Sequence, residues 1–170
     1  QGKKKAGASA SKANAGASKE QLLAARAWLL SADDYEISAN GMNIAAFSKE
    51  YISGVSVLQQ SLRVIQAGIT LAEVKGKDLI PNHALAMSTV QASDVFPREE
   101  ISYEQAIAYL RKEAIVLPGT VPRGYVLLTY KGVPLGFVKN IGNRANNLYP
   151  QEWRIRSGYL PDEILVMNHL

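Results

Sequence analysis

The stretch GYVLLTYKGVPLGFVKNIGNRANNLYPQEWRIR, residues 124–156, decides the predicted fold. Its first half predicts a β-hairpin, because residues 125–130 are aromatic and β-branched, Lys131-Gly132 is a turn pair, and residues 133–139 are again mostly apolar. Both alternating sets of hairpin side chains are apolar, which indicates burial on both faces, as in a small closed barrel. We therefore expect the hairpin to lie in a β-barrel.

The second half of the stretch is polar and basic. Residues 140–147 (NIGNRANN) predict a loop of amides, and residues 153–156 (WRIR) predict a short strand with alternating arginines. Residues 118–157 contain six lysines and arginines and one acidic residue, Glu152. Such charges attract phosphates, while unstacked bases bind aromatic faces and amide edges. This segment is the candidate nucleic-acid surface, although an ordinary solvated basic face would have the same composition.

The formal net charge of +4 hides an uneven distribution. Residues 1–19 contain five lysines and no acid, whereas residues 20–117 contain eight basic and twelve acidic residues. The basic balance of the folded part therefore lies in residues 118–157, as expected of a nucleic-acid surface. Residues 1–19 are otherwise rich in alanine, glycine and serine, so we expect a flexible linker there. The first residue is Gln1, which we interpret as the start of a piece of a longer protein.

Residues 20–91 predict a mixed α/β module. Ser18 and Asn82 are at N-cap positions, and Asp33-Asp34 predicts a charged turn. His83 is interpreted as a partnered core or turn histidine, with an RNA contact as the less favoured alternative. The expected elements are a helix to about residue 30, strands at 35–38 and 42–47, a helix at 50–60, strands at 62–66 and 69–74, and a short helix at 83–87.

Residues 92–160 predict a second domain, followed by a strand or tail at 161–170. Ser102 caps the clearest helix, at 103–113, and short strands are expected before residue 98 and at 115–117. Glu99-Glu100 is expected to be solvated, and Trp153 to be a core residue instead of a base-stacking one. Gly136 has two open interpretations: a bend or bulge at a barrel corner, or a close approach of RNA backbone.

Several kinds of chemistry are excluded or unsupported by the sequence. The chain has no cysteine, which removes disulfides, thiolate metal sites and a cysteine nucleophile. No GxGxxG or GxSxG motif occurs, and the two histidines lie 86 positions apart, so no metal-ligand spacing is present. No apolar run approaches the roughly 18 residues of a membrane helix. We therefore predict no catalytic and no metal-binding residue, and no membrane association.

Several motifs carry a family resemblance. They are Leu135-Gly136-Phe137-Val138-Lys139, Gly142-Asn143-Arg144, residues 146–150 (NNLYP) and residues 153–156 (WRIR). Together they resemble the C-terminal PUA-like domain of RsmF-type ribosomal RNA (cytosine-5) methyltransferases, of the Nop2/Sun-like family. Upstream, residues 64–68, 76–78 (GKD) and 81–86 (PNHALA) are similar to the preceding region of those enzymes. Residues 104–113, followed by a hairpin, resemble the helix-to-barrel junction of PUA-like domains. The resemblance covers roughly residues 28–160.

The resemblance implies an α+β chain, in which a mixed helix/strand module (20–91) precedes a PUA-like β-barrel (92–160). It implies that the chain holds ribosomal RNA for an N-terminal methyltransferase domain of the same parent protein. RsmF-type enzymes use a catalytic cysteine and S-adenosylmethionine, so the chain itself is expected to need no cofactor and to be no enzyme. The implied phosphate contacts are Lys131, Lys139, Arg144, Arg154 and Arg156; the implied base or ribose contacts are Asn143, Asn146 and Asn147, with Tyr149 as the stacking residue.

Two other functions stay open. The chain is alternatively a protein-interaction module whose basic loop meets an acidic partner, or a structural spacer that buttresses the catalytic domain. A spacer predicts exposed apolar side chains in the helix at residues 22–30 and self-association of the isolated chain. For the RNA-binding function we expect a monomer that binds ribosomal RNA in a bacterial-type cytoplasm.

Overall fold

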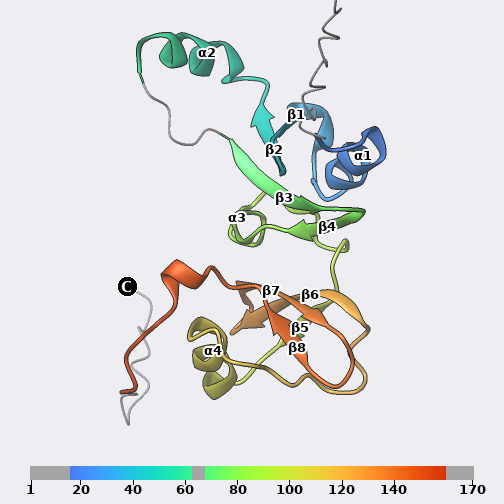
Figure 1. The fold of residues 1–170 in the computed structure, drawn as a ribbon, viewed down its shortest axis with the longest axis vertical. Coiled ribbons are helices and arrows are strands. Elements are labelled where there is room, and N and C mark those ends of the chain that lie inside the picture. Colours follow the sequence, from blue (N-terminus) through green and yellow to red (C-terminus); the bar gives the residue numbers. More distant parts are fainter. Residues whose placement is uncertain (1–15, 63–67, 160–170) are drawn as a thin grey trace, which may run out of the picture. The chain divides into compact units, whose positions relative to one another are not determined.

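The chain divides into two compact units, Gln1–Val95 and Phe96–Leu170, which are described separately. The computed structural model describes residues 16–62 and 68–159 (Figure 1). Three predictions lie wholly or mainly outside these residues: the linker at 1–19, the strand at 62–66 and the tail at 161–170. In the described residues the strands form two four-stranded sheets, one in each unit.

The first unit contains an antiparallel sheet with the strand order β1-β2-β3-β4. Its strands are β1 (Tyr35–Asn40), β2 (Asn43–Ser48), β3 (Ile69–Lys75) and β4 (Asp78–Pro81). Its helices are α1 (Lys19–Arg26), α2 (Ile52–Ser61) and α3 (His83–Ala86), with a 3-10 turn, η1 (Ala32–Asp34). The buried side chains of this unit include Ala25, Leu29, Ile44, Ala46, Leu71 and Leu85.

Local capping signals predicted the starts of α1 and α3 correctly. Ser18 forms a capping box with Gln21, and the Asn82 side chain accepts a hydrogen bond from the Ala84 amide at 2.9 Å. The end of α1 was predicted wrongly: the helix stops at Arg26, and Leu29 pairs with Gln91 in an isolated bridge. The strand β4 was not predicted, because four residues that follow a turn give a weak local signal.

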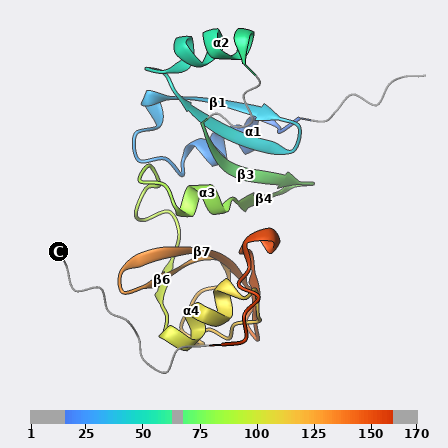
Figure 2. The same ribbon diagram turned by 90° about the vertical axis from the view of Figure 1, so that its left-hand side faces the viewer.

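The second unit contains the sheet β5-β6-β7-β8, in which β5 and β6 are parallel and the other pairs are antiparallel. Its strands are β5 (Arg98–Glu100), β6 (Gly124–Tyr130), β7 (Val133–Asn140) and β8 (Ala145–Asn147). A helix, α4 (Tyr103–Leu110), and a 3-10 turn, η2 (Gln151–Trp153), complete it. Figures 1 and 2 show α4 on one side of the β6–β7 hairpin.

The hairpin is buried on both faces, as predicted. Val126, Leu128 and Val138 form one core with residues from α4 and the flanking segments: Ile101, Ala106, Tyr109, Ile115, Leu117 and Ala145. On the opposite face Leu127 and Phe137 are also buried, and the Phe96 ring meets the Phe137 ring edge-on with centroids 4.8 Å apart. Helix α4 therefore covers one face of the sheet, and Phe96 packs against the other.

The structure distinguishes the two interpretations of Gly136, a bend or bulge and a close approach of RNA backbone. Its φ is +141°, and it pairs with Leu128 where the register of β6 and β7 shifts between Leu128 and Thr129. A β-bulge of this kind bends the hairpin, and glycine adopts the required positive φ without strain. Gly136 is itself buried, so the bend interpretation is confirmed, and the residue offers no exposed backbone to an RNA strand.

Several predictions for the second unit were wrong. Residues 145–147 form β8 instead of part of a loop, while residues 154–156 form no strand. Trp153 is 59% exposed, so it is not a core residue. Glu100, by contrast, is exposed as predicted. Its carboxylate also accepts a hydrogen bond from the Thr129 hydroxyl at 2.6 Å, which holds the pKa of Glu100 below its ordinary value.

Beyond the four paired strands, Ile115 forms an isolated antiparallel bridge with Ala145 at the free edge of β8. The predicted strand at 115–117 is thus reduced to this bridge. Closure of the sheet into a barrel remains a prediction. No helix in residues 16–62 and 68–159 is long and apolar enough to cross a membrane.

Candidate nucleic-acid interface

A row of three side chains crosses the sheet of the second unit. Tyr125 on β6 is opposite Lys139 on β7, and Lys139 is opposite Asn146 on β8. Register partners point to the same face of a sheet, so these side chains are neighbours. This is the face opposite to α4, because the adjacent positions Val126, Val138 and Ala145 belong to the core that α4 covers.

The row combines charge, an aromatic ring and an amide. The Lys139 ammonium lies 5.3 Å from the centroid of the Tyr125 ring, within the range of a cation–π contact. Asn146 is exposed, and Tyr125 and Lys139 are half-buried. Lys139 is suited to bind a phosphate, the Tyr125 ring to stack on a base, and the Asn146 amide to bind a base edge.

The buried side-chain amide of Asn140 holds the loop that follows β7 in place by hydrogen bonds. Asn140 is 4% exposed; its Nδ2 donates to the Val121 carbonyl at 3.0 Å and to the Pro122 carbonyl at 3.1 Å. Its Oδ1 accepts from the Gly142 amide at 2.9 Å, and the Ile141 amide donates to the Arg144 carbonyl at 3.0 Å. These bonds fix the backbone of residues 140–144.

The fixed loop presents Asn143 and Arg144 to solvent, next to the row. The Arg144 guanidinium forms no ion pair within the described part of the chain. Since Asn140 also ties the loop to Val121 and Pro122, the residue that follows them, Arg123, comes to the same place.

Arg123 was missed as a site residue. A Cβ added to Gly142, whose φ is +105°, would lie 2.9 Å from Nη2 and 3.0 Å from Nε of Arg123. The exposed guanidinium of Arg123 therefore lies directly over the loop at Gly142. Arg123 was counted among the basic residues of the sequence. It lies just before the hairpin, whereas the loop of residues 140–144 lies just after it. The pairing of β6 with β7 brings Arg123 and this loop together. We call Arg123, Tyr125, Lys139, Asn143, Arg144 and Asn146 the loop surface.

Asn147 and Tyr149, both predicted to contact RNA, make structural contacts. Asn147 Nδ2 donates to the Tyr109 carbonyl at 2.9 Å and to the Glu113 carbonyl at 3.0 Å, and its Oδ1 accepts from the Tyr149 amide at 2.9 Å. The Tyr149 ring packs edge-on against Tyr109, with centroids 5.4 Å apart, and the Lys112 ammonium donates to the Tyr149 carbonyl. Both residues thus join β8 to the end of α4.

Three predicted phosphate contacts lie away from the loop surface. Lys131 is in the turn at the other end of the hairpin, 5.6 Å from the Tyr130 ring centroid. Arg154 and Arg156 flank Ile155, whose amide donates to the Leu110 carbonyl at 2.9 Å, at the C-terminal end of α4. Because α4 covers the opposite face of the sheet from Lys139, the structure does not bring these arginines into one surface with the row.

Tyr109, a deeply buried titratable group of the second unit, has a structural role. Burial raises the pKa of the Tyr109 phenol, which donates to the Phe137 carbonyl at 3.2 Å and so acts as a buried structural donor. Among the residues that the structure describes, no three histidines or carboxylates gather as metal ligands. The arrangement can bind anions and bases.

The second unit corresponds to a known domain. Residues 96–155 match the family described as the methyltransferase RsmF PUA domain. This part of the chain belongs to the RsmF PUA domain family. The resemblance seen in residues 135–156 is confirmed, and the hairpin, the loop surface and α4 all lie within the RsmF PUA domain.

Similar full-length proteins carry the name ribosomal RNA small subunit methyltransferase F. The chain is 33% identical over 100 residues to that of Klebsiella pneumoniae and 36% identical over 100 residues to that of Cronobacter sakazakii; each match covers 58% of this chain. A third, from Shewanella sediminis, is 31% identical over 101 residues. The chain spans about one fifth of the length of these relatives. Because only 75 residues follow Val95, the similarity reaches into the first unit.

Proposed function

We propose that the chain is the RNA-binding portion of an S-adenosylmethionine-dependent ribosomal RNA (cytosine-5) methyltransferase. It holds the RNA so that a methyltransferase domain of the same parent protein reaches its cytosine. The loop surface carries this proposal, since it joins three cations, an aromatic ring and two amides on one fixed framework. The relatives are named for the small ribosomal subunit, so RNA of that subunit is the proposed ligand.

Within the loop surface each group has a role that follows from its chemistry. Arg123, Lys139 and Arg144 bind phosphates, and the exposed Asn143 and Asn146 bind base or ribose edges. The Tyr125 ring takes the stacking role predicted for Tyr149, while Asn147 and Tyr149 position β8. Lys131 is a peripheral phosphate contact at the far end of the hairpin.

Two structural expectations accompany this function. We propose that the PUA domain begins near Phe96, slightly later than the predicted boundary at residue 92, because the compact unit and the family match both begin there. The bridge between Ile115 and Ala145 supports closure of the sheet into a PUA-like barrel, since it extends β8 beyond its pairing with β7.

The test is a titration of the full chain with a small-subunit ribosomal RNA hairpin at several salt concentrations. Each phosphate contact contributes about 0.7–0.9 to the slope of log K against log salt. The variant Arg123→Gln/Arg144→Gln should therefore reduce this slope by about 1.4–1.8. A matched control, Lys75→Gln/Lys77→Gln, removes two exposed charges from the turn between β3 and β4 and should leave the slope unchanged. Equal slopes for both variants would contradict the loop surface.

A second function is favoured by the apolar surface of the first unit. On α2, Val57 is 63% exposed and Leu58 is 51% exposed, and on α1 Leu23 is 58% exposed. Exposed apolar side chains of this kind are typical of a protein interface. If the first unit is a spacer that buttresses the catalytic domain, the isolated chain should self-associate in sedimentation experiments, and Val57→Ser/Leu58→Ser should abolish the association.

A further inference from the structure

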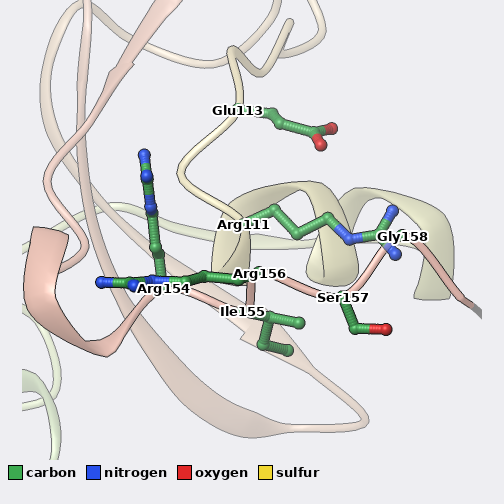
Figure 3. A pocket seen from close by; sticks show the side chains of 7 residues that line it. All are labelled: Arg111, Glu113, Arg154, Ile155, Arg156, Ser157 and Gly158. Carbon is green, nitrogen blue, oxygen red and sulfur yellow. The ribbon is translucent and has the colours of Figure 1, made fainter.

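A second basic site lies at the C-terminal end of α4. The segment after η2 runs past this helix end, and the Ile155 amide bonds to the Leu110 carbonyl at 2.9 Å. Between segment and helix is a pocket of about 330 Å³ (Figure 3). The lining side chains are Arg111, Glu113, Arg154, Ile155, Arg156 and Ser157, with Gly158.

The arginines of this pocket have no counter-ion among the residues that the structure describes. Within residues 16–62 and 68–159, neither Arg111, Arg154 nor Arg156 forms an ion pair. Nε and Nη2 of Arg111 are buried and have no hydrogen-bond acceptor in the described residues. Leaving charged donors buried without an acceptor costs free energy. A hydrogen-bond acceptor that enters the pocket therefore binds with a more favourable free energy here than on an open surface.

The three guanidinium groups do not converge on one point. In Figure 3, Arg111 reaches along the segment toward Ser157 and Gly158, whereas Arg154 and Arg156 extend away from it. A single free ion would contact only part of such a set. A strand with successive phosphates matches a row of separated cations, because guanidinium groups bind phosphate oxygens along a backbone.

The pocket is also separate from the loop surface. The helix α4 contributes Ala106 and Tyr109 to the core on one face of the sheet, while Lys139 is in the row on the opposite face. The cations at the end of α4 and those of the loop surface therefore lie on different sides of the sheet.

We propose that the pocket formed by Arg111, Arg154 and Arg156 binds successive backbone phosphates of RNA, as a second contact surface independent of the loop surface. This inference rests on the proposed RNA-binding function and deepens it. Glu113 lines the same pocket and is exposed, so its carboxylate opposes the incoming phosphates and weakens binding.

The test uses two variants with opposite expected signs, in the full chain and with the same ribosomal RNA hairpin. Arg154→Gln/Arg156→Gln should lower the salt slope by about 1.4–1.8 and weaken binding. Glu113→Gln should strengthen binding by about 1.5- to 5-fold, the usual range for one exposed charge interaction. A gain in affinity cannot come from a damaged fold, so the second variant keeps the test valid if the first is unstable.

The outcomes separate this inference from the proposed function. If both pocket variants bind with the wild-type slope while Arg123→Gln/Arg144→Gln loses binding, the pocket proposal fails and the proposed function stands. If the unmodified chain binds no ribosomal RNA, both fail. Competition by inorganic phosphate at millimolar concentration would instead identify a site for a free anion and overturn the assignment to strand phosphates. The control Lys75→Gln/Lys77→Gln should bind as the unmodified chain does.

Discussion

At the scale of single residues, Gly142 decides where Arg123 lies. Its φ of +105° is strained for any residue with a side chain, and an added Cβ would displace the Arg123 guanidinium from the loop. We expect Gly142→Ala to destabilise the second unit by about 1–2 kcal/mol, the typical cost of an unfavourable positive φ. RNA affinity should fall by less than it does in Arg123→Gln, because the added Cβ shifts the guanidinium away from the loop but its charge remains.

Thermal unfolding and RNA titration measure the two effects of Gly142→Ala separately. Gly119→Ala is the matched control, since an added Cβ at Gly119 meets no atom within 4 Å. This control should change neither stability nor affinity appreciably. A folded Gly142→Ala variant that binds RNA as tightly as the unmodified chain would show that the place of Arg123 over the loop is irrelevant to binding.

At the scale of elements, the strand β8 places two neighbouring asparagines in different roles. Asn146 is exposed on the face of the row, whereas Asn147 is bonded to the Tyr109 and Glu113 carbonyls at the end of α4. We expect Asn147→Ala to destabilise the second unit by about 2 kcal/mol, because two carbonyls lose their donor. Asn146→Ala should change stability by less than about 0.5 kcal/mol and should weaken RNA binding.

Denaturant unfolding and RNA titration of the two alanine variants test this division. Each variant is the control for the other, since both remove one amide from the same three-residue strand. If Asn147→Ala keeps full stability and loses RNA affinity, the original interpretation of Asn147 as an RNA contact is correct, and the structural role assigned to it is wrong.

The elements predicted correctly are those whose signals are local. The turn pair Lys131-Gly132 between two apolar runs defines the hairpin, and Ser102 with Gln105 defines the start of α4. The strand β8 and the path of residues 154–159 depend on distant partners instead. Ala145 pairs with Asn140 and Ile115, which are distant from each other in the sequence. The Ile155 amide donates to the Leu110 carbonyl, at the end of a helix and not in a sheet. The alternating arginines beside Ile155 therefore have a strand-like sequence pattern but do not form a strand.

The same distinction explains which residues of the candidate loop surface can be predicted from the sequence. Lys139, Asn143, Arg144 and Asn146 follow one another closely in the sequence, and the register of β7 and β8 keeps them together. Arg123 joins them through the pairing of Gly124 with Asn140 and the hydrogen bonds of Asn140 to Val121 and Pro122. Asn147 bonds to the end of α4, and Tyr149 packs against Tyr109. Both contacts join residues more than 30 positions apart in the sequence, so no local sequence pattern predicts them.

At the scale of the whole molecule, positive charge occurs in two separate stretches of sequence. Residues 1–19 contain five lysines and residues 118–157 contain six lysines and arginines, while the stretch between them is acidic. Lysines in a segment without large apolar side chains attract any polyanion, whereas cations fixed on a framework match a particular RNA shape. The two stretches should therefore contribute differently to RNA binding.

Deleting residues 1–12, which include four of these lysines, tests that difference. The deletion should weaken binding to a ribosomal RNA hairpin and to an unrelated hairpin of equal length by the same factor, and should reduce both salt slopes equally. The ratio of the two affinities should stay constant, because the loop surface and the pocket at the end of α4 are intact. A ratio that falls to one on deletion would place the discrimination between RNAs in the lysine-rich stretch, and the folded surfaces would then be general anion-binding sites.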